Sequence, residues 1–532
     1  MRAIAGSTAA LGLGLAVFLW RTRQIAGTHG VGAFSLDDAW IHLQFARNLA
    51  LGHGFSYNPD IPVSGSSAPL WTLLLGGAFT LAGAHPALAQ ALGIACTLLT
   101  AWLAGALTRR WTGSGDLALL VSVLTALAGP MLWGALSGME VALAAMLVTA
   151  ALVLRADERE LPAAISLGLA TLARPESILL VPLCWLSGPP TRRRALVWGL
   201  PVAACLLPWV VFNLVTVGSV LPGTAAAKIE GGLFGALNGV QEPLVTTLRD
   251  RPARYLGEWA AWLWQVDALL PLLLLPGLVA LGRRIGRAAL LPACVLLVHP
   301  IAMAVLAPYR GPGFQEGRYS IHLLPLALVV AVAPLAGFRR ESAAAPAPDR
   351  EGPPRVGWPS AVTARQIAAL ALLGGMLWAL PAAAARHAWA VQNIERMQVD
   401  IGRWVASRTD PSARLALNDV GAITYLSRRE VIDVMGLVTP AILRHRRDGE
   451  TGVLRYIEET CPDYLILFPA WFPTITSMTE RFEPVYRVHL DHNTVAGADE
   501  MVVYESVWSR WRSAPQDCPG ELARGPHSGR GK

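Results

Sequence analysis

The chain has 532 residues, of which 53% are hydrophobic and only 15% are charged, and its mean hydropathy is +0.43. Soluble chains carry about 25% charged residues, so this composition excludes an ordinary soluble enzyme and indicates a polytopic membrane protein. The formal net charge of +7 comes from 44 basic residues, of which only Lys228 and Lys532 are lysines. In a membrane protein such an excess marks the loops on the inner side rather than a nucleic-acid partner.

Long apolar runs predict about eleven α-helical membrane spans. The first run has Arg2 before it and Arg21 after it, and it is predicted to be an uncleaved span rather than a signal peptide. The runs cover residues 3–20, 87–108, 117–135, 138–154, 161–173, 176–188, 195–216, 262–282, 288–307, 319–337 and 364–385. Two of them, 161–173 and 176–188, are short for a hydrocarbon core of ~30 Å.

The run at 69–81 decides the predicted topology. If it crossed the membrane, Arg109, Arg110 and most later arginine clusters would face outward, whereas a half-buried or in-plane helix leaves all of them on one side. The positive-inside rule favours the second arrangement. It places the N-terminus in the cytoplasm and residues 21–86, 217–261, 308–318 and the C-terminal part outside.

The C-terminal part is predicted to be a small α/β domain, at 387–510. Strand-like runs at 414–417, 430–434, 464–468, 485–490 and 501–504 alternate with helical stretches near 390–407 and 440–458. The basic run at 444–447 is interpreted as a solvated helix face. Residues 338–363 resemble a flexible linker and 511–532 a disordered tail. Cys461 and Cys518 would suit a disulfide in an extracytoplasmic domain, and their spacing leaves the paired and free states open.

The first outer loop carries two adjacent carboxylates, Asp37 and Asp38, at the start of a predicted helix. Ser35 and Asp38 have the spacing of a capping box, which offers a purely structural reason for Asp38. Asp37 has no such reason, so it is the stronger candidate for a general base that takes a proton from an acceptor hydroxyl. His42, one turn later, is predicted either to orient a carboxylate or substrate or to be an ordinary interfacial histidine.

These motifs resemble those of GT-C glycosyltransferases, and the nearest group includes the mycobacterial terminal arabinofuranosyltransferases. The resemblance spans nearly the whole chain, in order. It rests on the segments 37–41, 45–50, 52–55, 58–59, 69–71, 137–140, 173–176, 221–224 with Lys228, 317–319 and 418–423. There are departures, because Trp40 replaces the usual Tyr, and Ser64, Ser66 and Ala68 replace Glu, Tyr and Asn. They leave the identity of the sugar open.

The resemblance implies an inverting glycosyltransferase in a bacterial cytoplasmic (inner) membrane. It would move a sugar, an arabinofuranose or another pentose, from a polyprenyl-phosphate carrier to a hydroxyl of a glycan or glycolipid acceptor at the outer face. The first-loop aspartate would be the base, and the lipid phosphate that leaves needs fixed positive charge. Lys228, Arg318 and Arg174 are the candidates for binding it. The alternative is that these residues contact lipid headgroups or pair locally, as Arg174 could with Glu176 or Glu140.

Three further polar residues are candidates for substrate binding: Glu140, Asn418 and Asp419. Glu140 opens a span, where a carboxylate is costly and often functional but could simply be hydrated. A turn after a strand explains Asn418 and Asp419 nearly as well. Asp37 and Asp38 could also hold a divalent cation such as Mg²⁺, Mn²⁺ or Ca²⁺. The alternatives to a pentosyltransferase are a mannosyl-type hexosyltransferase, a transporter or flippase for lipid-linked sugar, and a non-catalytic scaffold.

Overall fold

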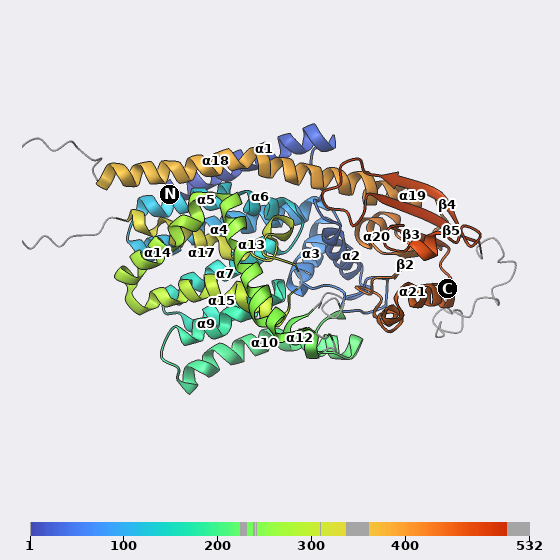
Figure 1. The fold of residues 1–532 in the computed structure, drawn as a ribbon, viewed down its shortest axis with the longest axis horizontal. Helices are drawn as coiled ribbons and strands as arrows, with labels where there is room; N and C mark the ends of the chain where they lie inside the picture. Colours follow the sequence, from blue (N-terminus) through green and yellow to red (C-terminus); the bar gives the residue numbers. More distant parts are fainter. Residues whose placement is uncertain are drawn as a thin grey trace, which may run out of the picture.

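The computed structural model describes residues 2–223, 231–237, 240, 242–308, 310–336 and 361–507. Figure 1 shows a body of helices with a small sheet domain at one end. The long helix α18 (Ala361–Ile394) runs beside α1 (Arg2–Ala26) along the body and leads directly into the sheet domain. Lys228, Cys518, the tail at 511–532 and most of the linker at 338–363 lie outside the described residues, so the predictions made for them stay predictions.

Most of the remaining helices form the body, and the predicted apolar runs between residues 87 and 337 each fall on one to three of them. Their bounds are α4 (Ala87–Thr112), α5 (Gly115–Leu127), α6 (Gly129–Leu136), α7 (Val141–Ala156), α8 (Glu160–Ala173), η1 (Pro175–Leu179), α9 (Leu180–Leu186), α10 (Arg192–Val217), α14 (Leu269–Ile285), η3 (Gly286–Ala289), α15 (Leu290–Leu306), η4 (Ile321–Leu323), α17 (Leu324–Val332) and η5 (Ala333–Leu335). Local chemistry sets several ends. For example, the Thr191 hydroxyl accepts the Arg194 N–H at the start of α10, and Gly218 ends the helix at φ +69°.

Five of the described helical stretches are long and apolar enough to cross a membrane: Arg2–Ala26, Ala87–Thr112, Arg192–Val217, Leu269–Leu306 and Thr363–Arg408. A sixth would be α5 with α6, which meet at a bend of 55°. Pro130, in the first turn of α6, explains this break because proline disfavours a continuous helix. The helices at 69–82, 141–156, 160–173, 175–186 and 321–335 are shorter. The chain is therefore a helical membrane protein, but the predicted count of eleven spans is not confirmed.

Arginines from several helices gather at the end of the body that lies away from the sheet. Arg284 at the end of α14 donates to the carbonyls of Thr112 (3.0 Å) and Ala336 (2.9 Å), which end α4 and follow η5. Arg110 pairs with Asp157, which follows α7 (Nη2–Oδ2 2.7 Å). These contacts agree with the prediction that these arginine clusters share one side. Which side of a membrane this is stays a prediction.

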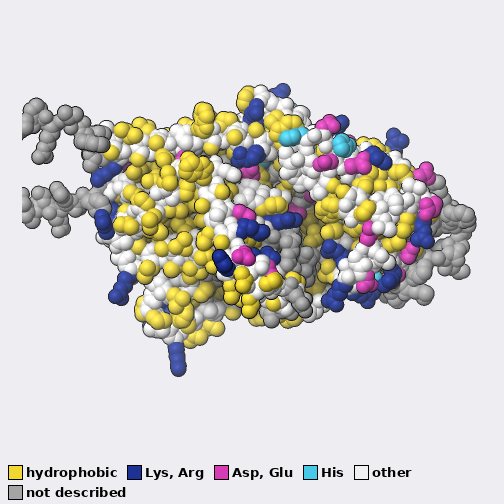
Figure 2. Space-filling model, in the orientation of Figure 1, with side chains coloured by type: hydrophobic (Ala, Val, Ile, Leu, Met, Phe, Trp, Pro, Cys, Tyr) yellow, Lys and Arg dark blue, Asp and Glu magenta, His cyan; other side chains and the backbone are white. Residues whose placement is uncertain are grey.

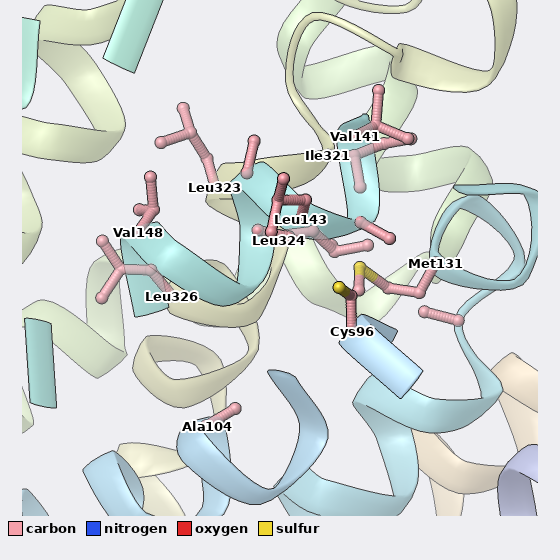
Figure 3. Packing of buried hydrophobic residues seen from close by; sticks show 14 of the residues in the cluster. Cys96, Ala104, Met131, Val141, Leu143, Val148, Ile321, Leu323, Leu324 and Leu326 are labelled. Carbon is pink, nitrogen blue, oxygen red and sulfur yellow. The ribbon is translucent and has the colours of Figure 1, made fainter. Parts of the chain in front are cut away.

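The core of the body is built from small and branched apolar side chains. Figure 3 shows Cys96 of α4 beside Met131 of α6, with side chains of α7, η4 and α17 in the same cluster and Ala104 further along α4. Small residues let the helices approach closely: a Cβ at Gly93 of α4 would lie 2.5 Å from the carbonyl oxygen of Ala135. Figure 2 shows that hydrophobic side chains dominate the visible surface of the body, whereas charges of both signs cover the sheet domain.

Five more helices belong to the loops between the long ones, and the first two lie between the body and the sheet domain. They are α2 (Asp38–Ala50), α3 (Pro69–Ala82), α12 (Gly232–Leu237), α13 (Arg251–Val266, preceded by the π-helical turn η2, Thr246–Asp250) and α16 (Phe314–Gly317). Helix α2 packs against α3 on one side and against α20 (Gly421–Ser427) of the sheet domain on the other (Figure 1). The predicted helix after the acidic pair and the predicted 69–81 helix are both present.

The C-terminal unit is an α/β domain with a five-stranded sheet in the order β2-β1-β3-β5-β4. Strands β2, β1 and β3 are parallel, and β5 is antiparallel to both β3 and β4. Its elements are η6 (Glu395–Val399), α19 (Asp400–Arg408), β1 (Arg414–Leu417), α20 (Gly421–Ser427), β2 (Glu430–Asp433), η7 (Pro440–Asp448), α21 (Gly449–Thr460), β3 (Tyr464–Leu467), α22 (Pro473–Thr476), β4 (Phe482–His489) and β5 (Glu500–Ser506). The five predicted strands are present, with bounds shifted by a few residues at most.

Candidate active site

Helix α2 begins at the acidic pair, but not through the predicted capping box. Asp37 is the N-cap residue and no side chain caps the helix. The Ser35 hydroxyl is buried without a hydrogen-bond partner among the described residues. Backbone geometry starts the helix instead, since the Trp40 N–H donates to the Asp37 carbonyl at 3.0 Å. The predicted capping box is therefore wrong, although Asp38 does lie in the first helical turn, where the helix dipole favours a carboxylate.

Asp37 joins the first loop to the C-terminal domain. Its two carboxylate oxygens accept the backbone N–H groups of Gly421 (2.7 Å) and Ala422 (2.8 Å), which begin α20. Gly421 is required by this close approach, because a Cβ there would lie 2.1 Å from the Asp37 carbonyl oxygen. Sequence reasoning gave Asp37 no structural role, and the structure supplies one across 384 residues of chain.

Asp37 lies in a cluster of carboxylates. Burial, followed by the charge of Asp419, raises the pKa of Asp37 to about 8, although the two backbone N–H groups lower it. Burial likewise raises the pKa of Asp419 to about 6, and the charge of Asp38 adds to that effect. Asp419 accepts a hydrogen bond from the Gln398 amide at 2.8 Å. The predicted residues Asp37, Asp38 and Asp419 are therefore brought together by the fold, and their negative charges act on one another.

Asp38 faces a different group, the guanidinium of Arg318. Nη2 of Arg318 lies 2.8 Å from Oδ2 of Asp38, whose side chain is 33% exposed, whereas that of Arg318 is 6% exposed. Nη1 of Arg318 donates to the Gln315 side chain at 2.7 Å. Its Nε is buried and has no hydrogen-bond partner among the described residues. An unsatisfied buried donor is costly, so this N–H is a candidate contact for an anionic ligand.

Arg174 lies nearby but is already neutralised. It pairs with Glu140 (2.7 Å) and Glu176 (2.6 Å), and all three side chains are less than a tenth exposed. Both local pairings that the sequence offered as the alternative are present. Arg174 and Arg318 also flank the ring of Tyr319, at 4.7 and 5.3 Å from its centroid. The fold brings these two predicted phosphate ligands together, and only Arg318 keeps an unused buried donor.

His42 and Glu140 link this ion-pair network to the first loop. Nε2 of His42 lies 3.3 Å from Oε2 of Glu140. Nδ1 of the same ring lies 3.2 Å from the Ser66 hydroxyl and 3.3 Å from that of Thr72. His42 thus orients a carboxylate, one of its two predicted roles, and Glu140 is a buried ion rather than a hydrated one.

Asn418 has a structural role in the sheet domain. Its side-chain oxygen accepts the Phe468 N–H at 3.1 Å and so joins the ends of β1 and β3.

Asn58 of the first loop contacts the C-terminal domain, and the sequence analysis did not predict this contact. Its amide donates to the Val431 carbonyl (2.8 Å) and accepts the Val431 N–H (3.0 Å), as an added strand would. A contact across 373 residues leaves no signal in local sequence.

The carboxylates do not make a ready cation site. Backbone N–H groups occupy both oxygens of Asp37, and Asp38 pairs with a guanidinium. Within the described ranges no group of three or more His, Cys, Asp or Glu side chains could hold a metal ion. In the observed arrangement these carboxylates therefore do not fit a divalent cation.

Comparison with known proteins identifies the fold. Residues 390–513 match a family described as a domain of unknown function, DUF8728. No curated protein matches the chain in sequence. The crystal structure of ArnT from Cupriavidus metallidurans bound to undecaprenyl phosphate is similar, with a TM-score of 0.56 and 13% identity, over 93% of this chain and 97% of that one. The oligosaccharyltransferase of Archaeoglobus fulgidus, tethered with an acceptor peptide, has a TM-score of 0.54 and 13% identity, over 93% of this chain and 74% of that one.

At this identity the likeness shows the fold alone, and it extends over both the helical body and the C-terminal unit. It agrees with the GT-C architecture that the sequence motifs implied. It does not select the arabinofuranosyltransferase-like group within that architecture. The chain shares its fold with ArnT and with this oligosaccharyltransferase.

Proposed function

We propose that the chain is an inverting glycosyltransferase that uses a polyprenyl-phosphate sugar as donor. The acceptor is a hydroxyl of a cell-envelope glycan or glycolipid, and the reaction takes place at the outer face of the cytoplasmic membrane. The fold of the two similar structures supports this class, since one is bound to undecaprenyl phosphate and the other to an acceptor peptide. The proposed sugar is arabinofuranose or another pentose, with a hexose as the alternative.

The observation that carries the proposal is the pair of Asp38 and Arg318. A carboxylate that is one-third exposed lies 2.8 Å from a buried guanidinium whose Nε has no partner in the described part of the chain. Donor phosphate competes for this guanidinium, because phosphate and carboxylate accept the same N–H donors. Donor binding therefore releases Asp38 as the charge on the leaving group is neutralised.

The chemical step follows from this exchange. The acceptor oxygen attacks the anomeric carbon while the bond from that carbon to the phosphate oxygen breaks. Asp38 takes the proton of the acceptor hydroxyl, and the lipid phosphate leaves with its negative charge against Arg318. Attack opposite the leaving group inverts the anomeric centre. Arg174 is too fully paired to bind the phosphate, and it holds Glu140 and the Tyr319 ring in place.

This proposal exchanges the roles that the sequence suggested for the two aspartates. Asp37 was favoured as the base because it had no structural role, and its bonds to Gly421 and Ala422 now provide one. A capping box was the structural alternative for Asp38, and that box is absent. We therefore assign Asp38 as the base and Asp37 as the residue that positions it against the C-terminal domain.

The test uses purified protein in detergent with synthetic polyprenyl-phosphate arabinose and polyprenyl-phosphate mannose, side by side. Release of polyprenyl phosphate is followed for the wild type, Asp38→Asn and Asp37→Asn. The wild type should turn over one donor, and Asp38→Asn should lower the rate about 10²- to 10⁴-fold. Asp37→Asn should lower the unfolding temperature, because an amide nitrogen cannot accept an N–H.

Equal turnover by the wild type and Asp38→Asn would move the chemistry away from Asp38. Loss of turnover in Asp37→Asn at an unchanged unfolding temperature would return the role of base to Asp37. A transporter or scaffold predicts no release of polyprenyl phosphate by any of the three proteins, even when acceptor glycans are supplied.

A further inference from the structure

The C-terminal domain has an open cavity of about 320 Å³ on the far side of the segment that touches the first loop. Its lining includes Met435, Arg446, Glu450, Val453, Trp471 and Phe472. None of these residues takes part in the site around Asp38. Arg446 belongs to the basic run that the sequence analysis interpreted as a solvated helix face.

Trp471 is unusual in this domain because its indole is exposed. Its exposed fraction is 42%, and it is the one large hydrophobic residue classed as exposed between residues 386 and 507. The ring is nevertheless held in place: its N–H donates to the Gly497 carbonyl at 3.1 Å, and the Phe468 ring lies 5.1 Å away. A Cβ at Gly497 would lie 2.5 Å from the Trp471 ring. A fixed aromatic face costs little conformational entropy on binding a ligand.

Polar groups of both kinds adjoin this aromatic face. Nη1 of Arg446 donates to the Met435 carbonyl at 2.7 Å, and Oε1 of Glu450 accepts the Ile475 N–H at 2.7 Å. These bonds fix the two side chains but use only one of the five guanidinium N–H donors and one of the two carboxylate oxygens. A rigid indole beside a donor and an acceptor matches a sugar ring, which offers C–H groups on its face and hydroxyls around its edge.

The cavity also lies where this type of sheet holds ligands. Met435 follows β2 and Trp471 follows β3, so both lie at the carboxyl end of the parallel strands, the usual ligand edge of an α/β sheet. The segment after Met435 then reaches the first loop. A Cβ at Gly65 would lie 2.8 Å from the Val438 side chain and 3.0 Å from the Leu437 carbonyl. One short segment therefore separates the cavity from the loop that carries the acidic pair.

We infer that this cavity binds a saccharide unit of the acceptor glycan, with the sugar ring against Trp471 and its hydroxyls on Arg446 and Glu450. The identification of this glycan as the acceptor rests on the proposed glycosyltransferase function. Saccharide binding itself is independent of that function. It gives the C-terminal domain the task of holding the growing chain while a hydroxyl further along that chain reaches Asp38.

The test measures binding of soluble glycans to the full chain in detergent, without donor. Saturation-transfer NMR is recorded with linear arabino-, manno- and cello-hexaoses, because it detects sugar C–H groups that lie against an aromatic ring. At least one hexaose should bind the wild type. Trp471→Ala should weaken that binding tenfold or more, Trp471→Phe should keep part of it, and Glu450→Gln should weaken it severalfold.

Trp378→Ala is the matched control, because Trp378 is 88% exposed on α18 of the helical body and should not affect the binding. Binding of no hexaose, or equal binding by the wild type and Trp471→Ala, would overturn the inference. Because no turnover is measured, this result is separate from the release of polyprenyl phosphate that tests the transferase. A protein that binds glycan but releases no polyprenyl phosphate would keep the saccharide site and lose the proposed reaction.

Discussion

The acidic pair at the start of α2 faces two different regions of the molecule. On the side of the C-terminal domain, Asp37 meets the backbone N–H groups of Gly421 and Ala422, which no substrate can move. On the side of the helical body, Asp38 meets the buried guanidinium of Arg318. Under the proposed function, two neighbouring aspartates thus have one permanent partner and one exchangeable partner. The kind of partner, more than the carboxylate itself, separates a structural role from a chemical one.

The largest effect on stability is expected at Arg174, a permanently paired residue that the sequence had suggested as a phosphate ligand. Arg174→Gln removes the cation between Glu140 and Glu176, all three of which are buried. It should cost about 3–5 kcal/mol of folding free energy, because buried charges are left unpaired. Thermal unfolding in detergent measures this loss. The control is Arg110→Gln, whose pair with Asp157 is about one-third exposed and should contribute less than about 1 kcal/mol.

Arg318→Gln is expected to affect the reaction rate rather than stability, the opposite of Arg174→Gln. Arg318→Gln leaves a partly exposed Asp38, so the unfolding temperature should change little, whereas the rate of polyprenyl phosphate release should fall about 10²- to 10³-fold. Arg386→Gln is its control, because Arg386 pairs with Glu316 two residues from Arg318 but at an exposed position. If Arg318→Gln lowers the unfolding temperature as much as Arg174→Gln does, both arginines have a structural role, and the distinction between the two aspartate partners is contradicted.

The contact between Asp37 and the C-terminal domain can be tested at Gly421. Gly421→Ala places a methyl group 2.1 Å from the Asp37 carbonyl oxygen, so the loop and α20 must separate. It should destabilise the protein by about 1–3 kcal/mol, which shows as a lower unfolding temperature. Gly257→Ala, in α13 with nothing within 4 Å of the added Cβ, should leave stability unchanged or raise it slightly. Equal behaviour of the two variants would contradict a tight contact at Asp37.

Local elements of the fold could be predicted from the sequence, whereas contacts between distant segments could not. The strands at 414–417 and 464–467, the helix after Asp38 and the apolar helices follow local composition and spacing, so they were predicted with small errors. The lengths of the spans were not predicted correctly, because bends such as that between α5 and α6 depend on packing. Asn58 with Val431, and Asp37 with Gly421, were missed altogether. Such pairs are joined only by tertiary structure, and a single sequence carries no periodic signal for them.

The smallest expected effect concerns a second carboxylate held by backbone N–H groups. Asp433 is fully buried and accepts the N–H groups of Met435 (2.7 Å) and Val438 (2.8 Å), and burial raises its pKa to about 6. A raised pKa means that the folded state binds more protons than the unfolded state between about pH 4 and pH 6. Its contribution to stability is therefore present at low pH and lost as the pH rises through that window, by about 1–2 kcal/mol.

Unfolding temperatures measured between pH 4 and pH 7 test this prediction. Asp433→Asn should lower stability at every pH but flatten the dependence between pH 4 and pH 6. The same slope in both proteins would show that Asp433 is ionised throughout, with its N–H partners outweighing burial. Asp37 could then be expected to behave in the same way.

The bonds from Asp37 to Gly421 and Ala422 have a mechanical consequence. Asp37 and Asp38 are consecutive, so one planar peptide unit joins the residue attached to the C-terminal domain with the residue that faces Arg318. A swing of that domain would be transmitted to the Asp38 side chain over the length of a single residue, about 3.8 Å between the Cα atoms. A domain that grips a glycan and moves would therefore carry the proton acceptor with it, which couples the arrival of a substrate to the alignment of the reaction.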